Sequence, residues 1–236
     1  QGLGTFMLGT YNTMFLGLPI SAVVALGTNK FAVADASTGV ARMGGVYLTE
    51  FGRLLYGTPL MWVVALAPLA FIFLFSFRMD RMTAASARTT FFAFAAVMGA
   101  SLSTLLIRYT GASVVQVFFI TAASFGALSL WGYTTSRSLS GIGSFLIMGV
   151  VGLIIASIVN IFLASSALQF AISVIGVLIF AGLTAYDTQK LKDMYLYGNY
   201  DGEAAAKVSV FGALTLYLDF INMFQFLLAL FGSRNE

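Results

Sequence analysis

The chain has 236 residues, of which 59% are hydrophobic and only 9% charged, with 12 basic and 9 acidic side chains. A soluble domain carries about 25% charged residues, so these charges are too few to cover a soluble protein of this length. The composition therefore places the chain in a membrane. It has no His and no Cys, which excludes histidine-dependent catalysis, thiol nucleophiles, disulfides and ordinary zinc sites. The net charge of +3 includes no dense basic run of the kind that binds nucleic acid.

Seven apolar segments are long enough to cross a hydrocarbon core about 30 Å thick, which takes about 20 helical residues. They predict an all-α integral membrane protein, with residues 1–236 forming a single seven-helix transmembrane domain. No enzymatic activity is expected, because the sequence has neither a phosphate-binding glycine loop after a strand nor a cluster of metal ligands. The segments comprise residues 6–27, 60–77, 91–107, 113–133, 142–163, 168–186 and 208–231.

Two connections between the predicted spans are long. Residues 28–59 are rich in glycine and are expected to form an interfacial loop on one membrane face. Loosely helical spacing of their apolar residues suggests an amphipathic helix there. Residues 188–207 are predicted to be a polar loop. A cytoplasmic N-terminus places seven Lys and Arg residues on the cytoplasmic side and five on the other, so this orientation is favoured.

Asp219 lies deep in the seventh predicted span, with apolar residues on both sides. An aspartate at the centre of a membrane helix costs about 2.5 to 3.5 kcal/mol on insertion scales, so it requires a structural or functional reason. At 100° per residue, Thr215 and Asn222 share its face of the helix and form a narrow polar stripe. This stripe is expected to face protein or a water-filled cavity. The simplest structural alternative is a protonated acid that is hydrogen-bonded to a neighbouring helix.

Asp187 ends the sixth span, one turn after Thr184, where the apolar run gives way to charged residues. The structural interpretation of Asp187 is that its carboxylate lies at the membrane boundary and pairs with Lys190. Asp187 and Asp219 come from consecutive spans, which we expect to be antiparallel neighbours. If their carboxyl groups meet, they cannot both remain ionised at short range, so they share a proton and titrate as a pair. Such a pair is suited to sensing pH.

An intramembrane aspartyl protease also uses two aspartates on adjacent membrane helices. Tyr186 and Asp187 fit that pattern superficially. The second aspartate does not, because residues 216–219 read LYLD and lack the flanking glycines of such proteases. The protease interpretation is therefore disfavoured.

Three segments resemble a known family: residues 185–189 (AYDTQ), residues 216–222 (LYLDFIN) and residues 118–133 of the fourth span. They are similar to the Bax-inhibitor-like, or transmembrane Bax inhibitor motif, membrane proteins, and most closely to bacterial members of the YccA-like branch. The resemblance implies six helices in two three-helix layers around a central C-terminal helix. It also implies a bacterial inner membrane location and a pH-sensitive calcium leak. Asp187 and Asp219 would gate this leak and contact the calcium ion.

The same resemblance implies a basic latch at the cytoplasmic end of the second span, where Arg78 is the best candidate and Arg81 the alternative. One departure from some bacterial relatives is that residues 62–68 contain no carboxylate, which leaves fewer anionic positions for an ion path. Thr184, Thr215 and Asn222 would support the aspartate pair.

Two functions follow from these expectations. The first is a calcium leak whose interacting species are the lipid bilayer, protons and calcium, with no cofactor apart from the transported ion. The alternative is a membrane interaction protein that regulates a membrane-anchored AAA protease or another partner without transport.

Overall fold

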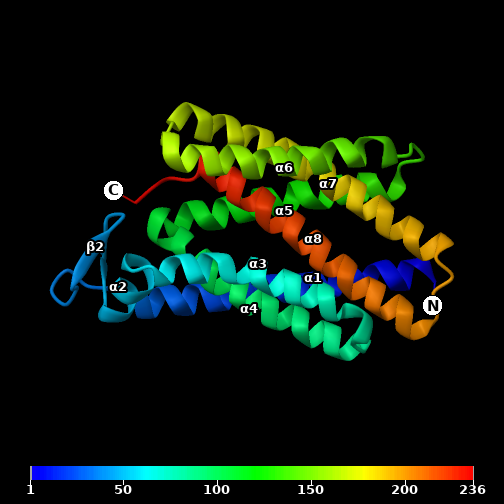
Figure 1. Cartoon of the computed structure of the whole chain (residues 1–236), viewed down its shortest axis with the longest axis horizontal. Coiled ribbons are helices and arrows are strands. Elements are labelled where there is room, and N and C mark those ends of the chain that lie inside the picture. Colours follow the sequence, from blue (N-terminus) through cyan, green and yellow to red (C-terminus); the bar gives the residue numbers. More distant parts are fainter. Residues whose placement is uncertain (1, 236) are drawn as a thin grey trace. The chain divides into compact units, whose positions relative to one another are not determined.

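The computed structural model of the protein describes residues 2–235, which are almost entirely helical (Figure 1). The seven longest helices of this part are each long and apolar enough to cross a membrane. The prediction of an all-α integral membrane protein is therefore confirmed. The helices are α1 (Leu3–Ala32), α2 (Glu50–Gly57), α3 (Leu60–Arg78), α4 (Ala84–Arg108), α5 (Gly111–Thr134), α6 (Ser140–Leu163), α7 (Ser166–Tyr197) and α8 (Gly202–Phe231), with a 3-10 turn, η1 (Met79–Arg81), after α3.

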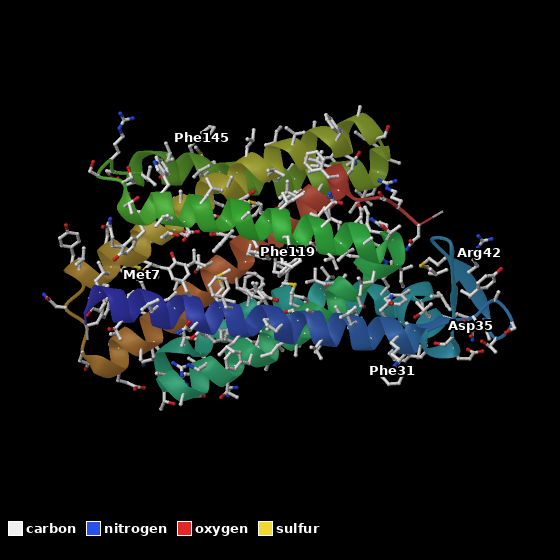
Figure 2. The ribbon with its side chains drawn as sticks, turned by 180° about the vertical axis from the view of Figure 1, so that it is seen from behind. Met7, Phe31, Asp35, Arg42, Phe119 and Phe145 are labelled. Atoms are coloured by element: carbon white, nitrogen blue, oxygen red, sulfur yellow. The ribbon has the colours of Figure 1, made fainter. Side chains whose placement is uncertain are left out.

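Many large apolar side chains lie on the outside of these helices rather than in a core. Phe145 and Phe162 of α6 are 68% and 84% exposed, and Phe145 points away from its helix (Figure 2). Such an outer surface is unfavourable in water and favourable in lipid. Of the seven long helices, α8 is the most buried.

The chain divides into two compact units. The first contains the start of α1 up to Met7, residues 112–201 with α5 to α7, and α8 from Phe211 onward. The second contains the rest of α1, all elements up to Gly111, the start of α8 to Val210, and the chain from Ser233. The single domain and the layered arrangement around a central helix remain predictions.

The polar loop predicted at residues 188–207 is wrong in its extent. Helix α7 continues to Tyr197 and α8 begins at Gly202, so only residues 198–201 connect them. The physical reason is that an apolar run marks the hydrocarbon core and not the end of the helix. At 1.5 Å per residue, the 32 residues of α7 span about 48 Å, well beyond a core of about 30 Å.

The segment predicted as an interfacial loop at residues 28–59 contains regular structure. Three short antiparallel strands, β1 (Val33–Ala34), β2 (Ala41–Met43) and β3 (Val46–Leu48), form a sheet in the order β1-β3-β2. In its register Val33 pairs with Leu48, and Arg42 pairs with Tyr47. The expected amphipathic helix is α2. It is shorter than the helix that the spacing of the apolar residues predicts.

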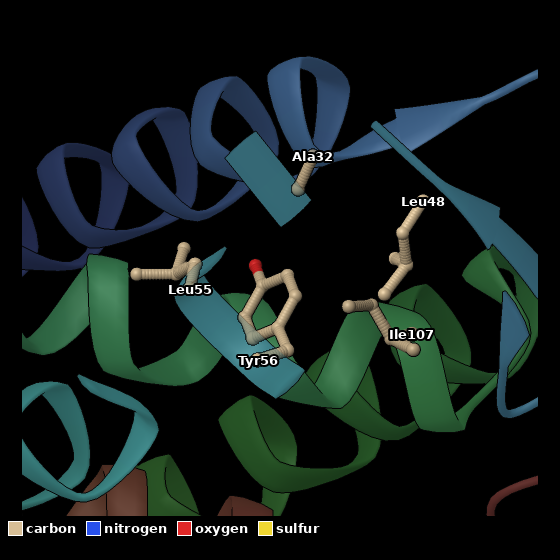
Figure 3. Packing of buried hydrophobic residues seen from close by; sticks show 5 residues of the cluster. All are labelled: Ala32, Leu48, Leu55, Tyr56 and Ile107. Atoms are coloured by element: carbon tan, nitrogen blue, oxygen red, sulfur yellow. The ribbon is translucent and has the colours of Figure 1, made fainter. Parts of the chain in front are cut away.

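Helix α2 is attached to the end of α1. Thr49 caps it by accepting a hydrogen bond from the Gly52 amide at 3.1 Å, while its hydroxyl donates to the Phe31 carbonyl at 2.7 Å. A side chain at Gly52 would overlap the Ala32 backbone, so this position requires glycine. The buried face of α2 joins a small apolar cluster made of Ala32, Leu48, Leu55, Tyr56 and Ile107 (Figure 3).

Tyr56 is the polar member of this cluster. Its hydroxyl shares a 2.7 Å hydrogen bond with the hydroxyl of Ser103 on α4. Burial raises the pKa of the Tyr56 phenol above 10.0, and the bond to Ser103 lowers it by a smaller amount. A neutral phenol is therefore part of the packing between α2 and α4.

Replacing Tyr56 with Phe removes this bond and should lower the free energy of unfolding by about 1 kcal/mol at neutral pH. Because the pKa is raised in the folded state, the contribution of the neutral phenol is complete below the unfolded-state pKa and is lost as pH rises through the folded-state pKa. Thermal unfolding in detergent, from about pH 8 to about pH 11, measures both effects. Tyr47→Phe is the control. Identical alkaline profiles for the wild type and Tyr56→Phe would contradict the role of Tyr56.

Candidate functional site

Asp187 and Asp219 are brought together by the packing of α7 against α8. The rings of Phe180 and Phe226 stack with centroids 5.9 Å apart, and Leu191 lies against Gly212. These contacts occur in opposite order along the two helices, so α7 and α8 are antiparallel. The predicted meeting of the two aspartates follows from this register, because each lies between the same two contacts.

The carboxyl groups of Asp187 and Asp219 are close enough for each to act electrostatically on the other. Asp219 is only 4% exposed. Its Oδ2 atom is buried and has no hydrogen-bond partner among the described residues. Asp187 is partly buried, and the charge of Lys190, one turn later on α7, also acts on it.

Phe220 and Phe224, which follow Asp219 on α8, pack against aromatic side chains of α5. Phe118 and Phe125 of α5 contact Phe220 of α8, with ring centroids 5.4 and 5.6 Å away. Phe118 also contacts Phe224 at 6.1 Å. Asp219 itself is buried, and a lone negative charge is strongly disfavoured in the interior of a membrane protein. Two arrangements would reduce the repulsion between the two carboxylates: one proton held between the carboxyl groups, or a cation that contacts both.

The donor set does not match a permanent calcium site. Calcium in proteins takes six to eight oxygen ligands, and the described residues contain no group of three or more His, Cys, Asp or Glu side chains that could hold a metal. Asp187 and Asp219 alone therefore supply too few side-chain oxygen ligands for a permanent calcium site.

The supporting residues Thr184, Thr215 and Asn222 are where the helical spacing placed them, but their described hydrogen bonds stay within their own helices. Thr184 donates to the Phe180 carbonyl at 2.8 Å, Thr215 to that of Phe211 at 3.1 Å, and Asn222 to that of Leu218 at 2.8 Å. They make the helix surface less apolar without binding the carboxyl groups directly.

A set of polar anchors after Asp187 has a role that the sequence does not reveal. Thr188 shares a 2.9 Å hydrogen bond with Ser129 of α5. Gln189 accepts a hydrogen bond from the Leu139 amide at 2.7 Å and donates to the Arg137 carbonyl at 2.9 Å. These bonds attach α7 to α5 and to the start of α6. The feature of the sequence that could have indicated these bonds is the presence of Thr188 and Gln189 directly after Asp187.

Two glycines allow close helix contacts beside the aspartates. A side chain at Gly132 of α5 would overlap the backbone of Ala185, two residues before Asp187. A side chain at Gly143 of α6 would overlap the ring of Tyr186. The position of Asp187 is thus determined from both sides by residues of the first unit.

The two candidate latch residues lie in the second unit. Arg78 is exposed at the C-terminal end of α3, and Arg81 is exposed in η1. Their role toward the aspartates remains a prediction.

Comparisons with known proteins agree with the resemblance found in the sequence. The family model described as "Inhibitor of apoptosis-promoting Bax1" matches residues 3–236. An uncharacterized protein of Caulobacter vibrioides is 49% identical over 100% of this chain and 91% of its own length. An uncharacterized Rickettsia prowazekii protein is 42% identical over 100% of this chain and 92% of its own length. The inner membrane protein YbhL of Escherichia coli is 41% identical over 99% of this chain and 93% of its own length.

The close contact between α5 and α7 can be tested with two substitutions on one helix. Gly132→Ala should lower the free energy of unfolding by about 1 to 3 kcal/mol, because its methyl group forces the backbones apart. Gly126→Ala is the matched control, since a side chain there meets nothing within 4 Å; it should be neutral or slightly stabilising. Thermal unfolding in detergent distinguishes the two. Equal stability of both variants would show that α5 and α7 are not in close contact at Gly132.

Proposed function

The chain belongs to the Bax inhibitor family, in its bacterial branch, and from this membership we propose that it is a pH-sensitive calcium leak of the inner membrane. The observation that carries the proposal is the pairing of the partly buried Asp187 with the buried Asp219, whose Oδ2 has no hydrogen-bond partner among the described residues. A buried carboxylate oxygen requires a proton, a water molecule or a cation. A proton and a cation therefore compete for the carboxyl groups of Asp187 and Asp219. In this proposal the N-terminus lies in the cytoplasm.

The protonation state of the pair supplies the gate. When the carboxyl groups share one proton, they attract each other and hold α7 against α8, which favours the closed state. When the proton leaves, two negative charges repel each other in an apolar environment, which favours an altered, open state. The same two charges attract a divalent cation at that moment. Calcium flux should therefore rise as the pH rises.

Calcium suits this gate because it is a hard cation that prefers carboxylate oxygen and accepts irregular coordination with several waters. Magnesium binds its water more tightly and requires stricter geometry, so it should pass less readily. Two carboxylates bind an ion strongly enough for it to enter and weakly enough for it to leave.

Arg78 is proposed to act as a latch on the closed state. It is the first basic residue after the apolar part of α3, and it is exposed. A guanidinium group is always charged and can bind a carboxylate with two parallel hydrogen bonds. Its removal should therefore favour the open state.

A flux assay with purified protein in liposomes that contain a calcium-sensitive dye tests the gate. Wild-type flux should increase by up to about tenfold per pH unit across the range in which one proton leaves the pair. Asp219→Asn cannot release that proton, so its flux should not depend on pH.

Asp80→Asn is the matched control, because it removes an exposed carboxylate in η1, outside the apolar spans. It should retain the pH response of the wild type. A wild-type flux that is indifferent to both pH and Asp219→Asn would reject the leak and favour the interaction function without transport.

The latch has its own test in the same liposomes. Arg78→Gln should raise calcium flux about tenfold or more at a pH where the wild type is mostly closed, because a charge-assisted contact contributes about 1.5 to 3 kcal/mol. Arg81→Gln identifies the latch if Arg78 is not involved, and Arg88→Gln is the control at an exposed arginine of α4. Unchanged flux in both Arg78→Gln and Arg81→Gln would exclude a basic latch at the end of α3.

A further inference from the structure

A second candidate site lies at the C-terminal end of α7, next to Asp187. It is an open cleft of about 360 Å³. Its walls include Tyr186, Lys190, Asp193 and Tyr197 of α7, Ser140 at the start of α6, and Tyr200 of the connection to α8. The cleft therefore contains one cationic side chain, one anionic side chain and three tyrosines.

Helical spacing explains why these side chains line one cleft. Tyr186, Lys190, Asp193 and Tyr197 follow each other at intervals of three or four residues, so they lie on one face of α7. After the helix, Asn199 adopts a left-handed conformation with φ 46°. This turns the chain back, and the ring of Tyr200 packs on Gly198, where any side chain would overlap it.

Lys190 and Asp193 both line the cleft, yet neither forms a salt bridge within the described part of the chain. The Lys190 ammonium lies 6.0 Å from the centre of the Tyr186 ring. By contrast, Lys192 donates a 2.8 Å hydrogen bond to the Tyr133 carbonyl and points toward α5. The cleft thus presents one positive and one negative group, so its best complement is a ligand that carries one charge of each sign.

The length of α7 places the cleft at the level of the lipid headgroups. The charged residues begin at Asp187, so the apolar part of this 32-residue helix lies before it, and all the cleft residues of α7 except Tyr186 lie after it. Helix α6, which contributes Ser140, begins with polar residues at the same level. Tyrosine is the residue type that is enriched where a membrane protein crosses from hydrocarbon to water.

We propose that this cleft binds a phosphodiester that carries a primary ammonium group, the headgroup chemistry of phosphatidylethanolamine. The phosphate lies at Lys190 and the Ser140 hydroxyl. The ammonium lies at the Asp193 carboxylate, against the tyrosine rings, which attract cations through their π faces. A purely anionic headgroup is disfavoured because Asp193 repels it, and a simple cation is disfavoured because Lys190 repels it. The ligand comes either from the bilayer or from water as glycerophosphoethanolamine.

Native mass spectrometry of the purified full chain in detergent, titrated with dioleoyl phosphatidylethanolamine or dioleoyl phosphatidylglycerol, tests this inference. The phosphatidylethanolamine should bind at least about tenfold more tightly than the phosphatidylglycerol. Lys190→Gln and Asp193→Asn should each weaken its binding about tenfold or more, as expected for loss of one charge-assisted contact. Lys207→Gln, on α8 and outside the cleft lining, is the matched control and should retain wild-type affinity within about twofold.

Equal affinity for the two lipids, or unchanged phosphatidylethanolamine binding in Asp193→Asn, would overturn the proposal. An equal loss in Lys207→Gln and Lys190→Gln would overturn the assignment to this cleft. Competition with glycerophosphoethanolamine shows whether the ligand comes from the bilayer or from water. Displacement of the lipid at similar concentration supports a soluble ligand of the same chemistry, and resistance to displacement supports the lipid. None of these readouts depends on calcium transport.

Discussion

The structure depends on the burial of Asp219. An isolated aspartate in the apolar interior of a membrane helix is unfavourable by several kcal/mol, and Asp219 is buried. The chain compensates with a second carboxyl group, Asp187, on an antiparallel helix, and the two groups satisfy each other only while they hold a proton or a cation. The stability of the site and its response to ligands therefore have the same physical origin.

A pair of this kind requires a rigid frame, since small shifts between α7 and α8 change the repulsion between the carboxyl groups. The frame is made by Gly132, which brings α5 into backbone contact with α7, and by Thr188, Gln189 and Lys192, which bind neighbouring elements just beyond Asp187. Hydrophobic association is weak between helices in lipid, so close contacts at small residues and buried hydrogen bonds determine which helices pack together.

Much of this arrangement could be predicted from the sequence, because the membrane imposes simple rules. Apolar runs located all seven spans, and the scarcity of charge made Asp219 conspicuous and Asp187 its natural neighbour. The C-terminal end of α7 and the start of α8 were not predictable from hydropathy, because a helix continues into water without a change of backbone. The small sheet was missed because strands as short as Val33–Ala34 carry no readable alternation. The role of Gln189 was hidden because its partners are backbone groups of Arg137 and Leu139.

The most direct test of the shared proton is infrared spectroscopy of the protonated carboxyl stretch in membranes, followed against pH. A proton held between Asp187 and Asp219 predicts a protonated carboxyl band at neutral pH that is lost in Asp219→Asn. In Asp187→Asn, the pH at which this band disappears should move, because the second carboxyl group no longer acts on the first. A band that disappears at the same pH in the wild type and in Asp187→Asn would contradict a shared proton. It would leave Asp219 as an independent buried acid.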